Sequence, residues 1–117
     1  MAIPSGSGTE VLKYSYKQAL TNSAHTLITG VADHIYTILS IVYTEKGGDT
    51  ELLRLALYDS DGTSNEHYIL RETEIPIYGV FIWNDKFVFS GNKTLRTRTA
   101  VSGNVDVICS YIDQDWT

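Results

Sequence analysis

The chain has 117 residues, with 9 Lys and Arg against 14 Asp and Glu, so its formal net charge is −5 with neutral histidines. This length is typical of a single domain, and a hydrophobic content of 43% with 20% charged residues excludes a disordered or fibrous chain. The acidic balance argues against nucleic acid as the main partner, and the apolar stretches are too short to cross a membrane.

The chain begins with a small, polar segment that includes Gly6 and Gly8. Such a segment buries too little apolar area to offset its ordering entropy, so residues 1–9 are predicted to form a flexible N-terminal arm. Residues 10–117 are predicted to form one domain. The start has neither a basic region nor a long apolar run, so no secretory signal is indicated, and we expect synthesis in a cytoplasm.

Alternation of apolar and polar residues predicts the first strands. From Glu10 onward, Leu12, Tyr14 and Tyr16 fall on one side of an extended segment, which indicates a half-buried strand with these side chains in the core. Residues 34–44 are apolar on both faces and predict a central core strand. The segment 16–26 is the least regular, and residues 17–20 are compatible either with extended chain or with the start of a short helical turn.

The second half of the chain repeats strands and turns at short intervals. Strands are expected around residues 53–57, 68–70, 77–83, 87–89, 95–99 and 105–111. The turn formers at residues 59–64 predict a hairpin between the first two of these strands. Pro76 is expected before a strand, since it lacks an amide hydrogen. Eight or nine strands at this spacing predict an all-β fold, a single-domain antiparallel β-sandwich or a barrel.

The candidates for chemistry are weak. Residues 59–66 gather oxygen ligands around Gly62, but they lack the spacing of a calcium loop. The three histidines are scattered, and Cys109 alternates with Val107 and Tyr111 as a small core residue would. No nucleophile or phosphate-binding motif is present. We therefore predict a non-enzymatic protein with no catalytic residue, metal site or cofactor.

Aromatic and basic residues are the candidates for partner contacts. Tyrosine and tryptophan are enriched both in β-sandwich cores and at interfaces, so their abundance does not separate the two roles. Tyr36 is placed in the core with the tyrosines of the first strand. Arg96 and Arg98 lie on one predicted strand, where they either protect a sheet edge or pair with an acidic neighbouring subunit. The residues predicted to contact partners are Ile3, Pro4, Tyr58, Tyr78, Trp83, Arg96, Arg98 and Trp116.

Four segments resemble small virion proteins of tailed bacteriophages, especially phages of cyanobacteria and marine bacteria. These segments are residues 3–13 (IPSGSGTEVLK), 33–38 (DHIYTI), 83–91 (WNDKFVFSG) and 107–116 (VICSYIDQDW). The resemblance covers most of the chain and implies a jelly-roll-like sandwich of about eight strands in the virion, made in the host bacterial cytoplasm. It carries over no catalytic residue.

The resemblance implies a decoration (cement) protein that binds the assembled capsid and stabilises it, with the major capsid protein or other virion subunits as partners. A tail or fibre-associated component, including a receptor-binding one, is the alternative, and a host-sugar-binding module is another class. A homo-oligomer, either a trimer or a dimer, is expected. Residues 1–10 and the tail at Trp116 are expected to extend onto neighbouring subunits, so that deleting residues 2–9 would reduce capsid occupancy.

Overall fold

The computed structural model describes residues 9–59, 66–101 and 103–115, and within these ranges it contains strands and no helix. The nine strands are β1 (Thr9–Lys17), β2 (His25–Thr29), β3 (His34–Glu45), β4 (Glu51–Tyr58), β5 (His67–Ile75), β6 (Val80–Trp83), β7 (Phe87–Ser90), β8 (Thr94–Thr99) and β9 (Val105–Asp115). Every pair of neighbouring strands is antiparallel.

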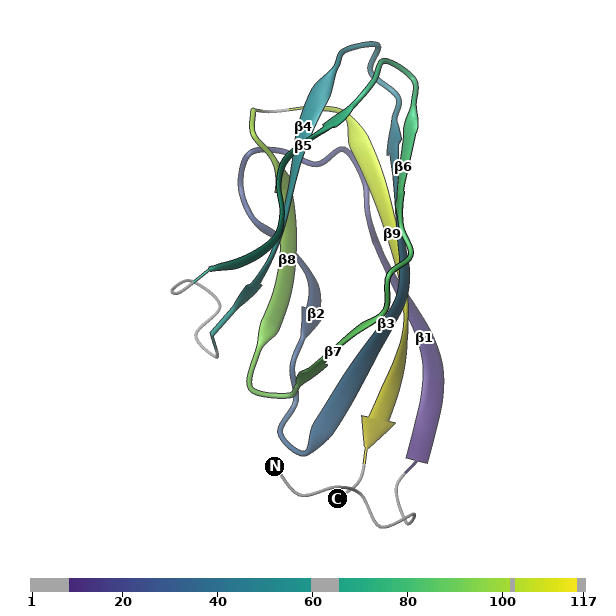
Figure 1. Ribbon diagram of the computed structural model, residues 1–117, viewed down its shortest axis with the longest axis vertical. Helices are drawn as coiled ribbons and strands as arrows, with labels where there is room; N and C mark the ends of the chain where they lie inside the picture. The colour runs from purple at the N-terminus through teal and green to yellow at the C-terminus, as the bar shows by residue number, and fades with distance from the viewer. Residues whose placement is uncertain (1–8, 60–65, 102, 116–117) are drawn as a thin grey trace.

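The strands form two sheets that face each other (Figure 1). The five-stranded sheet has the order β1-β9-β3-β6, with β7 also pairing with β3, and the four-stranded sheet has the order β2-β8-β4-β5. β6 pairs with the second half of β3 and β7 with its first half, so together they act as one interrupted strand. Apart from the β4–β5 hairpin, consecutive strands therefore alternate between two effectively four-stranded sheets, which is the arrangement of a jelly roll. The predicted antiparallel sandwich is confirmed.

Three local differences from the sequence-based expectation have physical causes. β2 was not predicted, because its five residues contain too few alternations to be distinguished from a loop. β6 begins at Val80, later than expected, because a turn in which the Gly79 N–H donates to the Pro76 carbonyl occupies the preceding residues (2.9 Å). The hairpin joining β4 and β5 is confirmed by their pairing, while its turn lies outside the described residues.

Residues 17–20 do not form the helical turn that the sequence left open. Ala19 has a positive φ of 53°, and the Leu20 N–H donates to the Val105 carbonyl (2.8 Å). Leu20 is completely buried. The segment therefore leaves β1 and anchors one side chain in the core between the sheets.

The core lies between the two sheets. Its fully buried side chains come from both layers and include Leu53 and Leu55 of β4 and Val107 and Cys109 of β9. Cys109 was predicted as a core residue, and this is confirmed. The same is true of Tyr36, which is 2% exposed.

The placement of Tyr14 and Tyr16 in the core was wrong. Leu12, Tyr14 and Tyr16 are 72%, 70% and 65% exposed. β1 does alternate as predicted, but its register against β9 places Tyr16 opposite Ile108, on the side of the sheet that faces away from the second layer. The apolar row of this edge strand is therefore presented to the outside.

Candidate interaction surfaces

The outer face of the five-stranded sheet is largely apolar, and we call it the apolar face. The strand register places one set of exposed hydrophobic residues on this side: Leu12, Tyr14 and Tyr16 of β1, Val80 and Ile82 of β6, Val88 of β7 and Ile108 of β9. Each of these side chains is at least half exposed. An uncovered apolar surface of this breadth is typical of an interaction site.

Along β1, β9 and β3, charge is confined to the ends of the apolar face. In the register of β1, β9 and β3, Glu10 lies near one end and Asp106 near the other, and the outward positions between them are apolar or uncharged polar residues. An open depression in its centre is lined by residues that include Leu12, Tyr14, Leu39 and Ile108. Fully desolvated contact is cheapest on such a surface because no charge loses its water there.

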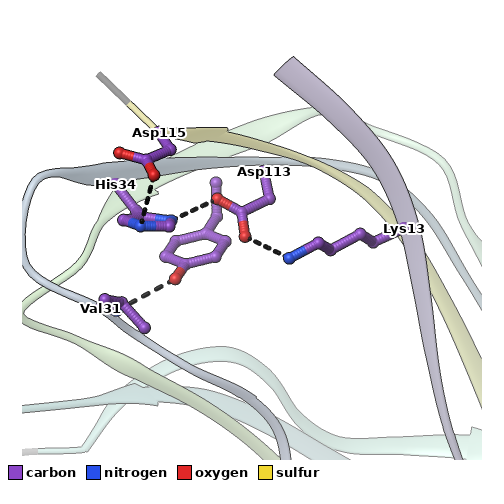
Figure 2. Close-up of polar contacts among 6 residues, drawn as sticks. Lys13, Val31, His34, Asp113 and Asp115 are labelled. Carbon is purple, nitrogen blue, oxygen red and sulfur yellow. Dashed lines mark hydrogen bonds and ion pairs between the residues drawn. The ribbon is translucent and has the colours of Figure 1, made fainter. Parts of the chain in front are cut away.

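A polar cluster on the inner side ties β1 to the sheet (Figure 2). Lys13 Nζ lies 2.8 Å from Asp113 Oδ2, and His34 Nδ1 lies 2.6 Å from the other carboxylate oxygen. His34 Nε2 is 3.6 Å from Asp115 Oδ2. β1, β3 and β9 each contribute to this cluster, so it holds the edge strand in one register.

The charges of the cluster perturb its carboxylate. Burial raises the pKa of Asp113, but hydrogen bonds from Lys13 and His34 and their charges outweigh it, so the net pKa lies below its ordinary value of 3.8. The hydrogen bond to Asp113 raises the pKa of Lys13 against a smaller effect of burial. Asp113 is thus an ionised, nearly buried group whose partners are both on neighbouring strands.

The outer face of the four-stranded sheet carries charged residues of both signs, unlike the apolar face. Arg98 lies opposite Arg54 in the pairing of β8 with β4, and Arg96 places its guanidinium 5.5 Å from the centre of the Tyr58 ring. Glu66 lies 3.8 Å from Arg98 Nη2, and hydrogen bonds from Tyr68 and Tyr58 lower the pKa of Glu66. A shallow depression is lined by Ala24, Tyr58, Glu66, Arg96 and Arg98.

The structure thus brings together three of the residues predicted to contact partners. Arg96 and Arg98 are half-buried on one face, and the Arg96 Nε donates to Thr26 Oγ1 (3.0 Å). Tyr58 is only 5% exposed, because the arginine covers its ring. It holds Arg96 in place, and its small exposed part lines the depression.

Tyr78 lies at the opposite end of the sandwich and is 70% exposed. Its N–H donates to Glu45 Oε1 (2.9 Å), and the same carboxylate accepts the N–H groups of Gly47 (2.6 Å) and Gly48 (2.9 Å). The backbone hydrogen bond from Tyr78 is the main reason that the pKa of Glu45 lies below its ordinary value. A buried carboxylate therefore joins the β3–β4 turn to the β5–β6 turn and fixes Tyr78.

Of the remaining predicted contact residues, Trp83 is half-buried against the core, where its ring meets Phe87 edge to face. Ile3, Pro4 and Trp116 lie outside the described residues, as does the rest of the expected arm up to residue 8. Thr9, which was expected in the arm, is instead the first residue of β1, where it pairs with Asp115.

Sequence reasoning missed the apolar face because alternation gives no information on which side of a strand is covered. In β1 the apolar side faces away from the second sheet. The opposite side carries Lys13 and Lys17, and because lysine is rarely buried, these residues favoured the wrong side as the covered one. The pairing of Lys13 with Asp113 shows that the lysine side of β1 is the one that faces the second sheet.

The described residues offer little for catalysis. They contain no group of three or more His, Cys, Asp and Glu side chains placed to hold a metal ion. Cys109 is buried, and burial raises the pKa of its thiol to about 12, so it is a poor nucleophile. In this part of the chain no helix is long and apolar enough to span a membrane.

Comparison with known proteins identifies the fold through structure alone. No protein-family model matches the sequence, and no curated protein matches it. A chain from the disulfide-linked pili of Bacillus endospore appendages superposes with a TM-score of 0.56 and 10% identity, covering 100% of this chain and 97% of that one.

Two virus particles contain a similar fold. A chain of infectious bursal disease virus (Gx strain) gives a TM-score of 0.57 at 12% identity, covering 93% of this chain and 33% of the viral one. This protein thus matches about a third of that viral chain. A chain from the acid-stable capsid structure of Helicobacter pylori bacteriophage KHP30 gives 0.50 at 10% identity, covering 94% of both chains. These likenesses place the protein in the class of jelly-roll β-sandwiches.

Proposed function

We propose that this chain is a non-enzymatic virion structural protein that binds the assembled phage capsid and stabilises it as a decoration (cement) protein. The observation that carries the proposal is the apolar face, an uncovered sheet surface on a fold of the kind found in virus particles. Its partners are the major capsid protein or other virion subunits, and it is located in the virion after synthesis in the host cytoplasm.

The apolar face is the surface that docks on the particle. Its central residues carry no charge, so contact with a matching apolar surface removes little hydration from polar groups. Weak contacts of this kind sum to strong attachment when many copies bind one particle. Of residues 1–10, Thr9 and Glu10 belong to β1, so residues 1–8 and Trp116 extend the contact onto neighbouring subunits. Arg96 and Arg98, on the opposite face of the sandwich, and Tyr78, at one pole, meet further virion subunits.

The test uses capsids purified without this protein, to which the full chain is added back. Ile82→Glu introduces a charge into the apolar face at a side chain that is 56% exposed, and Val101→Glu is the control at 64% exposure on the β8–β9 connection. We expect Ile82→Glu to reduce occupancy at least about tenfold, since each 1.4 kcal/mol of lost binding is tenfold, and Val101→Glu to leave it unchanged. Equal occupancy of both variants would exclude this face as the docking surface.

A second arm of the experiment separates head from tail. Tailless heads and isolated tails are incubated with the protein in parallel, and bound chain is quantified on each. Binding to heads supports the decoration role, whereas binding only to tails supports the alternative of a tail or fibre-associated component. Deletion of residues 2–9 is expected to lower occupancy on heads while the domain stays folded.

A further inference from the structure

The free edge of β1 is unlike the other sheet edges of the molecule. β1 pairs with β9 over nine residues without a register shift. At the other edges, β6 and β7 have four residues each, β2 has five and a register irregularity, and β5 has two irregularities. Short or bulged edges are protected against pairing with another strand, and only β1 lacks both protections among the described strands.

Backbone groups of β1 are available for pairing. In an antiparallel ladder every second residue directs its N–H and C=O away from the neighbouring strand. Among the described residues, none forms a backbone hydrogen bond with these groups on the free side of β1. Lys13 does not block this edge, because its ammonium is directed to Asp113 of β9.

We infer that β1 pairs with β1 of a second copy of this chain across a two-fold axis, which joins the two five-stranded sheets into one continuous sheet. The inference concerns self-association, an interaction distinct from docking on a particle. It extends the proposed function, because it selects the dimer over the trimer as the oligomeric state.

The side-chain pattern of β1 is complementary to itself in one register. Residues that oppose each other across a sheet lie on the same face. When Tyr14 opposes Tyr14 of the second copy, Leu12 opposes Tyr16 and Lys13 opposes Ser15, so no like charges meet. The apolar rows of the two copies then form one patch of aromatic and aliphatic cross-strand pairs, which stabilise a sheet.

The neighbouring registers are less favourable. A shift in one direction opposes Lys13 to Lys13 of the second copy, and a shift in the other opposes Lys13 to Lys17 and leaves Ser15 on the axis. Like charges directly opposite each other are destabilising. Centring the pair on Leu12 leaves Tyr16 outside the paired segment. Charge and apolar contact therefore select the register centred on Tyr14.

The test measures the oligomeric state of the free full-length protein by analytical ultracentrifugation, without particles. The wild type is expected to be dimeric at micromolar concentration. Tyr14→Lys and Tyr14→Glu each place two like charges at the axis, and each is expected to weaken dimerisation at least about tenfold. An equimolar mixture of the two variants places Lys opposite Glu and is expected to restore the dimer.

The control pair is Val101→Lys and Val101→Glu, at an apolar side chain that is 64% exposed and lies outside β1, on the β8–β9 connection. Circular dichroism checks that every variant is folded. A monomeric wild type, or a dimer that survives both Tyr14 variants, would overturn the inference. Monomeric single variants whose mixture stays monomeric would overturn the register. Since no capsid is present, these outcomes are independent of whether the protein docks on a particle.

Discussion

Lys13 and Asp113 form an ion pair of 2.8 Å that crosses from the edge strand β1 to β9. The side chain of Asp113 is 7% exposed and that of Lys13 is 44% exposed, so the lysine covers the carboxylate. Because His34 binds the other oxygen, removal of either partner leaves an acceptor of Asp113 unsatisfied. The pair therefore links the position of the edge strand to the ionisation of one aspartate.

The first prediction concerns acid stability. The folded-state pKa of Asp113 lies below the ordinary 3.8, so ionisation stabilises the native state above pH 3.8, and this contribution is lost as pH falls through the folded pKa. Asp113→Asn should lower the free energy of unfolding by about 2 kcal/mol at neutral pH. Its urea-unfolding free energy should then fall less steeply than that of the wild type between about pH 5 and about pH 2.

The control for this experiment is Asp85→Asn, which changes an exposed aspartate on the β6–β7 connection. Its acid profile should follow that of the wild type. If Asp113→Asn shows the same steep acid dependence as the wild type, the carboxylate does not contribute as described.

The second prediction concerns the hydroxyl pair that joins the two sheets. Tyr43 Oη lies 2.7 Å from Thr97 Oγ1, and Thr97 Oγ1 donates to the Arg54 carbonyl (2.7 Å). Since Thr97 has one hydroxyl hydrogen, Tyr43 must be the donor to it. Tyr43→Phe should therefore lower the free energy of unfolding by about 1 kcal/mol, as measured by chemical denaturation.

Thr97→Val should cost more than Tyr43→Phe, by about a further 1 kcal/mol, because it leaves the Tyr43 hydroxyl without its acceptor and the Arg54 carbonyl without this donor. The reverse order would show that the hydroxyl pair is oriented the other way.

The third prediction concerns the close approach of two turns. A Cβ added at Gly91 would lie 1.6 Å from the Val31 carbonyl oxygen, and that neighbour is backbone, which cannot rotate away. Gly91→Ala should destabilise the domain by about 2–4 kcal/mol, within the range of severe single substitutions. Thermal unfolding followed by circular dichroism provides the measurement.

The exposed Asn92 on the same turn supplies the comparison. Asn92→Ala removes a hydrogen bond with Ser90 at the surface and should change stability by less than about 0.5 kcal/mol. Similar decreases in the stability of the two variants would mean that the turn rearranges to accept the Cβ of Gly91→Ala.

The fourth prediction uses the buried thiol as a reporter. Cys109 has no exposed surface, and burial raises its pKa to about 12. At mildly alkaline pH a thiol reagent should label the native protein roughly a thousandfold more slowly than the protein in urea, because labelling requires opening of the core. Rapid labelling of the native protein would show that β9 opens locally.

The sequence was sufficient for the strand content and the two-layer class, because alternation and turn residues are local properties. It was insufficient for the side on which β1 is covered, since that depends on its register with β9, a strand almost a hundred residues away. For the same reason Tyr58 was expected at the surface. Its burial results from Arg96, which the β4–β8 pairing places beside it.

The candidate surfaces also differ in how far local sequence could predict them. Arg96 and Arg98 were identified because their spacing on one strand places them on one face. The apolar face is built from four strands, and no short segment contains its pattern.

The pairing of Thr9 with Asp115 has a practical consequence for labelling. The described chain enters and leaves the sandwich side by side at one pole, and the turns held by Glu45 lie at the other (Figure 1). A fluorescent protein joined directly before Thr9 or after Asp115 would emerge from the same pole, whereas a dye attached at the turn of Tyr78 would mark the far one. The distances of the two tags from a binding surface would report which pole of the molecule faces that surface.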